Sequence, residues 1–164
     1  MKSGTAFAGP LEAVMFKHLL LPTDGSKLSE AMIHKAIAFA RDAHAQVTAI
    51  HVTEPFHTFS LRAEMLEDTG ERYERDSRAR ADHYLGMVQR EAGEKGVACD
   101  TICVTSDHPY EANVAAAQRR GCDLIMMASH GRNALSAALI GSETQKVLSH
   151  CRIPVLVYRE PVTA

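Results

Sequence analysis

The sequence predicts an α/β fold with a five-stranded, mostly parallel, doubly wound sheet in the order 3-2-1-4-5 and helices on both faces. Strand-like and helical segments alternate along the chain, which favours a parallel sheet with right-handed crossovers. The strand-like segments are nearly continuous in apolar residues, as is typical of strands covered on both faces. Gly, Pro and Asp residues separate the segments and mark the turns.

The first strand is expected at Lys17–Leu21, which contains three consecutive leucines and stops at Pro22. Asp24-Gly25-Ser26 then supplies a turn and a helix cap. Apolar residues at helical spacing predict a helix over Lys27–Ala43. The β-branched segment Gln46–Val52 predicts the second strand.

A loop with two phenylalanines and a long polar helix are expected next. Phe56 and Phe59 lie in the loop, where they have two possible roles: a lid over a ligand or an anchor to the core. The helix is predicted over Leu61–Lys95, with a break or kink at Thr69-Gly70, because glycine is costly inside a helix. Gly96 ends it.

The second half of the chain continues the alternation. Pro109 is well suited to the first position of a helix, with Asp107 as a nearby cap, and that helix ends before Gly121. The remaining expected elements are strands at Ala98–Thr105, Asp123–Met127 and Ile153–Tyr158, a glycine-bearing loop at Ala128–Gly141, and a helix at Ser142–His150.

Composition limits the class of protein. The chain has 164 residues, 46% of them hydrophobic, and a net charge of −2, so one globular domain is expected and no basic excess is available for general nucleic-acid binding. No apolar run is long enough for a membrane span, and the N-terminus does not resemble a signal peptide. We therefore expect a cytoplasmic protein with reduced thiols at its scattered cysteines. The domain is predicted over residues 15–160, between a flexible extension at 1–14 and a short tail at 161–164.

A candidate anion site lies between the first and fourth strands. With the strand order above, Asp24 and the loop after the fourth strand flank the point where the order reverses, and ligands bind there in open α/β sheets. Gly131 and Gly141 allow close approach of backbone amides, and the helix starting at Ser142 directs its free amides to the same space. Arg132 can add a compensating charge. The spacing alone leaves two interpretations open, a phosphate cradle or a purely structural loop.

The segment from Phe16 to Tyr158 resembles the universal stress protein family. The resemblance is carried by five motifs in the order of the family: Lys17–Ser26, Ala49–Val52, Asp123–Gly131, Gly141-Ser142 and Ile153–Val157. It implies a doubly wound domain that usually forms homodimers. From the charge and the lack of a long apolar run we expect no nucleic-acid or membrane partner. One branch of the family binds ATP through a loop with the pattern Gly, two residues, Gly, nine residues, Gly, then Ser or Thr. This chain has Gly131, Gly141 and Ser142 at that spacing, but Ala128 at the first glycine position.

The resemblance also implies roles for particular residues. It places Thr23, Asp24 and the backbone near Val52 at the adenosine end of a bound ATP, and Met127, Ala128, His130 and Gly131 along the ribose and phosphates. Pro22 and Arg132 are also expected among the nucleotide-binding residues. The outer phosphates would meet Gly141, Ser142, Glu143 and Thr144, with Mg²⁺ held largely by phosphate oxygens. The carboxylate of Glu143 would have to turn outward.

Three hypotheses for function remain open at this stage. The first is an ATP-binding stress-response or signalling module without strong catalysis, which has an unidentified protein partner. The second is a nucleotide-free dimeric scaffold whose pocket is disabled by Ala128; a positive φ there would cost about 1–2 kcal/mol. The third is a slow ATP hydrolase, although neither a general base nor an activated nucleophile is evident.

Several site residues also have purely structural interpretations. Asp24 can cap the first helix together with Ser26. Ser142 can form a capping box with Gln145. The last strand is expected at a sheet edge, where exposed apolar residues invite pairing with a second copy. The predicted dimer edge is Val155, Leu156 and Val157.

Overall fold

The computed structural model describes residues 15–56, 63–131 and 139–160, with side chains undescribed at 63–68. The predicted terminal segments at 1–14 and 161–164, and Phe59, lie outside these ranges. The order of elements is β1 (His18–Pro22), α1 (Lys27–Asp42), β2 (Gln46–Thr53), α2 (Ala63–Glu94), β3 (Cys99–Thr105), α3 (Pro109–Arg120), β4 (Leu124–Ala128), α4 (Ser142–His150) and β5 (Val155–Tyr158).

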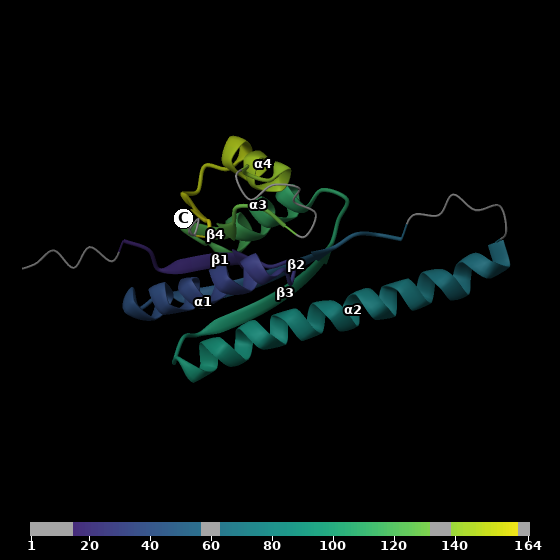
Figure 1. Ribbon diagram of the computed structural model, residues 1–164, viewed down its shortest axis with the longest axis horizontal. Coiled ribbons are helices and arrows are strands. Elements are labelled where there is room, and N and C mark those ends of the chain that lie inside the picture. The colour runs from purple at the N-terminus through teal and green to yellow at the C-terminus, as the bar shows by residue number, and fades with distance from the viewer. Residues whose placement is uncertain (1–14, 57–62, 132–138, 161–164) are drawn as a thin grey trace, which may run out of the picture.

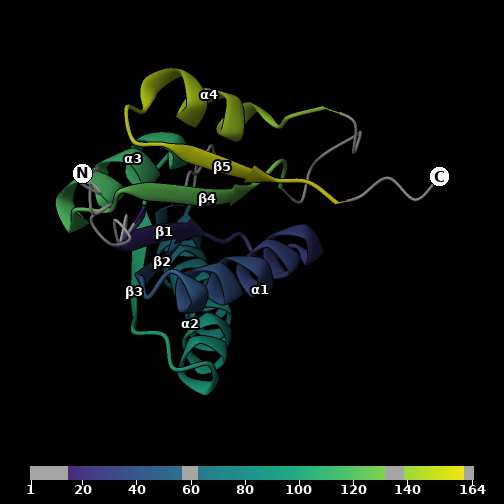
Figure 2. The same cartoon turned by 90° about the vertical axis from the view of Figure 1, so that its left-hand side faces the viewer.

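The five strands form one parallel sheet in the order β3-β2-β1-β4-β5, which confirms the predicted fold. Helices α1 and α2 cover one face, and α3 and α4 cover the other (Figures 1 and 2). Strand β1 lies at the centre, between β2 and β4, so its carboxyl end is where the strand order reverses. This topology places a ligand-binding crevice beside Pro22 and the end of β4.

The three leucines of β1 divide the core into two halves. Leu19, Leu20 and Leu21 are all fully buried. Leu19 and Leu21 pack into the cluster under α1 and α2, whereas Leu20 packs into the cluster under α3 and α4. Adjacent side chains of a strand point to opposite faces, so a strand that is apolar throughout is buried on both. The sequence-based interpretation of this strand is confirmed.

Helix α2 is one continuous helix of 32 residues, and the break predicted at Thr69-Gly70 is wrong. The Phe56 ring lies against Gly70, where an added Cβ would be 3.4 Å from Phe56 Cδ1, and it contacts the Tyr73 ring at 5.3 Å between centroids. Gly70 therefore accommodates an aromatic side chain beside the helix instead of breaking it. These contacts favour the anchoring role for Phe56. The helix extends past the sheet in Figure 1.

The predicted dimer edge lies where expected in the sheet. Strand β5 pairs only with β4 among the described strands, and Leu156 on it is 40% exposed. It is shorter than predicted, because regular pairing starts at Val155 after Pro154, and proline cannot donate to a strand ladder. Among the helices that the structure describes, none has the length and apolar character needed to cross a bilayer.

Candidate functional site

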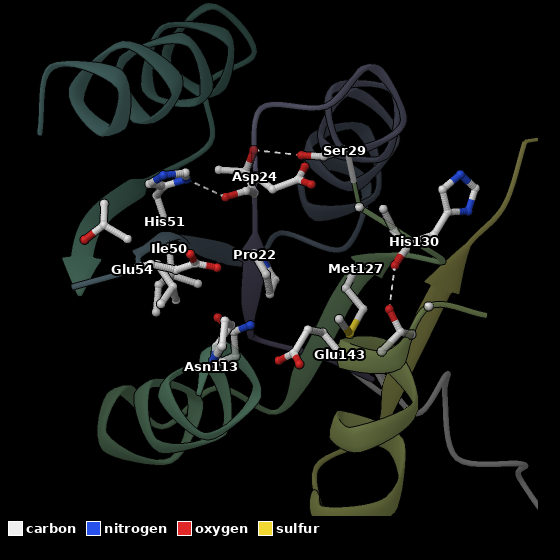
Figure 3. Close-up of a pocket in the computed structure, with 18 of the residues that line it drawn as sticks. Pro22, Asp24, Ser29, Ile50, His51, Glu54, Asn113, Met127, His130 and Glu143 are labelled. Carbon is white, nitrogen blue, oxygen red and sulfur yellow. Dashed lines mark hydrogen bonds between the residues drawn. The ribbon is translucent and has the colours of Figure 1, made fainter. Parts of the chain in front are cut away.

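A cavity of about 560 Å³ opens at the carboxyl ends of β1, β2 and β4 (Figure 3). Its volume lies in the range of small-molecule pockets. Every predicted nucleotide-site residue within the described ranges lines it; Arg132 lies outside those ranges. The predicted residues brought together here are Pro22, Thr23, Asp24, Val52, Met127, Ala128, His130, Gly131, Gly141, Ser142, Glu143 and Thr144.

The turn after β1 is held by hydrogen bonds of its own side chains. Asp24 Oδ1 accepts from the Ser26 amide at 2.9 Å, and Ser26 Oγ accepts from the Ser29 amide at 3.2 Å as the cap of α1. The buried hydroxyls of Thr23 and Ser29 bond each other at 2.7 Å. Asp24 therefore does serve the turn, and this role coexists with a place in the cavity wall.

His51 fixes the position of this turn from the neighbouring strand. Its Nδ1 lies 2.8 Å from the Thr23 carbonyl oxygen, which only accepts, so Nδ1 carries the proton. The His51 ring also packs on Tyr84 of α2, at 5.4 Å between centroids. The sequence analysis did not select His51, because its partners come from β1 and α2.

Two glycines allow the loop after β4 to approach its neighbours closely. A Cβ on Gly131 would lie 2.7 Å from Asp24 Oδ2, and one on Gly141 would lie 3.1 Å from His130 Cα. The Gly141 amide donates to the Ser129 carbonyl at 2.7 Å, which ties the two ends of the loop together. The side chain of His130 is directed away from the centre of the cavity (Figure 3). Its Nδ1 lies 3.0 Å from Ser129 Oγ.

Helix α4 presents free amides to the cavity. The N-cap residue is Gly141 instead of Ser142, and glycine has no side chain with which to bond the first amides of the helix. The predicted capping box of Ser142 and Gln145 is therefore wrong: Ser142 already has helical geometry, and Gln145 Nε2 donates to Ile140 O at 2.8 Å. Among the described residues, no acceptor is bonded to the amides of Ser142, Glu143 or Thr144. Such a helix start, with its dipole, suits an anion.

Ala128 carries no backbone strain. It is the last residue of β4, and among the described residues other than glycine only His44 has a positive φ. Its carbonyl accepts from Thr144 Oγ1 at 3.0 Å, and Thr144 is buried. The Thr144 hydroxyl thus docks α4 on the end of β4. The strain penalty considered for Ala128 from the sequence does not apply.

The Glu143 carboxylate bonds the start of α3. Its Oε2 accepts from the Tyr110 amide at 2.8 Å, and its Oε1 accepts from Lys146 Nζ at 2.8 Å. This bond to Glu143 raises the pKa of Lys146. Asp107 was expected near the α3 cap, but the N-cap residue is His108, whose side chain makes no cap bond. The Tyr110 amide at the start of α3 is bonded instead by the Glu143 carboxylate of α4.

Asn113 of α3 is the clearest polar residue that the sequence analysis missed. It lines the cavity and is 6% exposed, and its Oδ1 has no hydrogen-bond partner among the residues that the structure describes. Its signal in the sequence is a single polar residue among the buried alanines 112, 116 and 117 of the helix. The other lining residues that were missed are Ser29, Ile50, Thr53, Glu54, Tyr73, Ser77, Arg80 and Pro109.

Among the described residues, the site contains few groups suited to metal binding. Within the described part of the chain, no group of three or more His, Cys, Asp or Glu residues is placed to hold a metal ion. The charged residues in the cavity wall are Asp24, Glu54, Glu143 and Arg80. A metal that entered with a polyphosphate would therefore rely mainly on oxygens of the ligand.

The fold and the site together define a class of protein. It comprises α/β domains in which a doubly wound parallel sheet, glycines and the first turn of a helix form a crevice suited to a nucleotide. Residues 15–159 match the model of the universal stress protein family. The chain belongs to this family.

Individual relatives agree with this assignment. The chain is 30% identical over 155 residues to the universal stress protein MJ0531 of Methanocaldococcus jannaschii, covering 90% of this chain and 84% of that protein. The solved structure of MJ0577 from the same organism superposes with a TM-score of 0.76 at 27% identity, covering 91% of this chain and 99% of the other.

Two more distant structures share the fold and are described with nucleotides. One is a universal stress protein in complex with cAMP, with a TM-score of 0.65 at 22% identity, covering 89% of this chain and 99% of the other. The other is a universal stress protein family protein of Arabidopsis thaliana with AMP bound. It has a TM-score of 0.64 at 16% identity, covering 89% of this chain and 93% of the other.

Proposed function

We propose that the cavity binds an adenine nucleotide, with ATP and its Mg²⁺ as the full ligand, and that the protein is a stress-response signalling module. One observation carries the proposal: the amides at the start of α4, which bond no acceptor in the described part of the chain, line the same cavity as Gly131 and Gly141. Backbone donors of this kind bind phosphate without a charged side chain. The nucleotides named for two structural relatives support an adenine ligand.

The orientation of the ligand follows from the cavity wall. Val52 and the turn at Thr23 and Asp24 would hold the adenosine end, and the start of α4 the phosphates. The fit of a triphosphate rests on the free amides of Ser142, Glu143 and Thr144. Mg²⁺ would neutralise phosphate charge and stay on phosphate oxygens, since few carboxylates converge on one point.

Calorimetry of the purified protein tests the proposal directly. Saturable binding of ATP with Mg²⁺, or release of an adenine nucleotide on denaturation as identified by mass spectrometry, supports it. No heat of binding with AMP, cAMP or ATP at millimolar concentration would leave the alternative of a nucleotide-free scaffold. GTP at the same concentration is the control for base selectivity.

We propose that the module has no dedicated catalytic pair. Neither Asp24, which is bonded within its turn, nor His130, whose ring is directed away from the cavity, is placed as a general base for water. Any slow ATP hydrolysis should survive the double change Asp24→Asn and His130→Ala. Loss of a measurable turnover in that variant, with nucleotide binding retained, would identify a catalytic role instead.

Homodimerisation through β5 is the proposed assembly. Strand β5 forms an edge of the sheet within the described residues, and the apolar Leu156 on it is exposed. Light scattering should give twice the mass of one chain for the unmodified protein. It should give one chain for Leu156→Lys, because a buried charge without a partner is costly. We further expect the protein in the cytoplasm, which cell fractionation tests.

A further inference from the structure

The Glu143 carboxylate occupies the end of the cavity where phosphates are expected. Glu143 is the second residue of α4, and its side chain extends from there toward α3 (Figure 3). Its backbone amide has no acceptor among the described residues, while its carboxylate accepts from the Tyr110 amide at 2.8 Å. Glu143 thus contributes both a hydrogen-bond donor, its backbone amide, and a negative charge, its carboxylate, to this end of the cavity.

The start of α3 is therefore already satisfied by an internal anion. Two helix starts, of α3 and α4, face each other across this end of the cavity, and each would favour an anion. At α3 the Tyr110 amide is taken by Glu143, and Pro109 has no N–H to offer. A phosphate chain that extends past α4 consequently meets a carboxylate and not a second set of donors.

The local cation offsets this charge only in part for a ligand. Lys146 Nζ bonds Glu143 Oε1 at 2.8 Å and lies over the Tyr110 ring, 5.4 Å from its centroid. Lys146 is not in the cavity wall, and the pair is partly exposed, with side-chain accessibilities of 47% for Lys146 and 37% for Glu143. The described wall contains one basic side chain, Arg80 on α2, whose Nη2 bonds Ser77.

We propose that Glu143 makes the binding of polyphosphate nucleotides dependent on a divalent cation, whereas a nucleotide with a single phosphate binds without one. The inference rests on the proposed adenine-nucleotide function and adds the ionic form that the site accepts. A bound Mg²⁺ neutralises part of the triphosphate charge and removes its repulsion with the carboxylate. The single phosphate of AMP adjoins the ribose, so in the proposed orientation it lies beside the loop after β4 and farther from Glu143 than the outer phosphates of ATP.

The experiment compares the dissociation constant of each nucleotide in the presence of Mg²⁺ and in the presence of EDTA. The ionic strength is kept constant, because added salt by itself screens surface charge. For the unmodified protein, Mg²⁺ should strengthen ATP binding by about tenfold or more, and should change AMP binding less than about twofold. We call the factor by which Mg²⁺ strengthens ATP binding the ATP ratio. In Glu143→Gln, which keeps an acceptor for the Tyr110 amide, the ATP ratio should fall to about threefold or less. Glu111→Gln is the matched control, because it removes the same charge at the start of α3 outside the cavity, and its ratio should equal that of the unmodified protein.

A second variant tests the same idea in the opposite direction. Lys146→Met leaves the Glu143 carboxylate in place without its cation, so the ATP ratio should rise above that of the unmodified protein. This variant decides the question even if Glu143→Gln fails to fold, which circular dichroism would reveal. Equal ratios in the unmodified protein and in the folded variants would overturn the inference. Absence of binding by AMP and ATP alike would instead overturn the proposed function.

Discussion

Asp24 and Gly131 meet across the crevice between β1 and β4. A Cβ on Gly131 would lie 2.7 Å from Oδ2 of Asp24, closer than side-chain carbons approach such an oxygen, while Oδ1 of the same carboxylate accepts from Ser26. Gly131, at the second glycine position of the loop motif, therefore leaves room for the Asp24 carboxylate. The glycine links the position of the loop to the turn that caps α1.

Gly131→Ala should displace the Asp24 carboxylate. Because its bond to the Ser26 amide would weaken, we expect a loss of about 1 kcal/mol in the free energy of unfolding, measured in urea. Nucleotide affinity should fall by about tenfold, measured by calorimetry. Gly93→Ala is the control, because nothing lies within 4 Å of a Cβ there. It should stabilise α2 by up to about 1 kcal/mol. An unchanged stability of Gly131→Ala would contradict the contact.

Ala128→Gly should change ATP affinity by less than about threefold. Ala128 ends a regular strand without a positive φ, so its methyl group carries no backbone penalty that glycine would relieve. Calorimetry with ATP and Mg²⁺ checks this expectation. A large gain of affinity from an inactive parent would support the disabled-pocket hypothesis and would show that the methyl group clashes with the ligand.

Asn113→Leu should raise the free energy of unfolding by about 1 kcal/mol in the protein without ligand. The change removes a buried oxygen that has no partner among the described residues, and leucine has the same branched shape and number of heavy atoms as asparagine. Thermal melts in the absence of nucleotide provide the measurement. Asn113→Asp serves as the comparison and should be destabilising, because a carboxylate would be buried without a partner. A lower melting temperature for Asn113→Leu would show that the amide is satisfied in solution.

His18 should make stability depend on pH near neutrality. Burial lowers the pKa of His18 below the ordinary histidine value of 6.5, although Asp123 acts in the opposite direction. Its ring accepts from Gln46 Nε2 at Nδ1 and lies 2.8 Å from the Thr48 hydroxyl at Nε2, which suits the neutral form.

Because the unfolded chain takes up the proton first, the contribution of His18 is complete above pH 6.5 and is lost as pH falls through the folded pKa. Since the ring is partly exposed, the loss should be below about 1 kcal/mol. Urea titrations from pH 8 to about 5 should show this slope in the unmodified protein and a smaller one in His18→Gln. Equal slopes would exclude His18 as the source.

Local sequence patterns were sufficient for the sheet and for the loop beside the cavity, whereas most of the predicted lining residues came from the family resemblance. The three leucines of β1 predicted burial on both faces, and the spacing of Gly131, Gly141 and Ser142 predicted a loop that returns to a helix start. These features depend on residues that are close in sequence. The predictions at helix ends were less successful, because neighbouring residues can exchange the capping role. Gly141 takes the place expected for Ser142, and Glu143 supplies the bond expected near Asp107.

The residues that were missed come from elements that only the tertiary structure brings together. Arg80 and Ser77 reach the cavity from α2, and Asn113 reaches it from α3. Nothing in the local pattern of α2 distinguishes a residue facing the cavity from one facing solvent or core, and the signal in α3 is a single polar residue among alanines. Gly70 illustrates the same limit, since its partner Phe56 precedes the helix and compensates for the low helix propensity of glycine.

The hydrogen bond between the Gly141 amide and the Ser129 carbonyl has a consequence for variation of the chain. It joins two backbone groups, so it does not depend on the identity of either side chain. It holds the ends of the segment between β4 and α4 together at the base, beside the first amides of α4. Exchange of the Ser129 side chain for one of similar size should therefore leave the path of the chain into α4 unchanged.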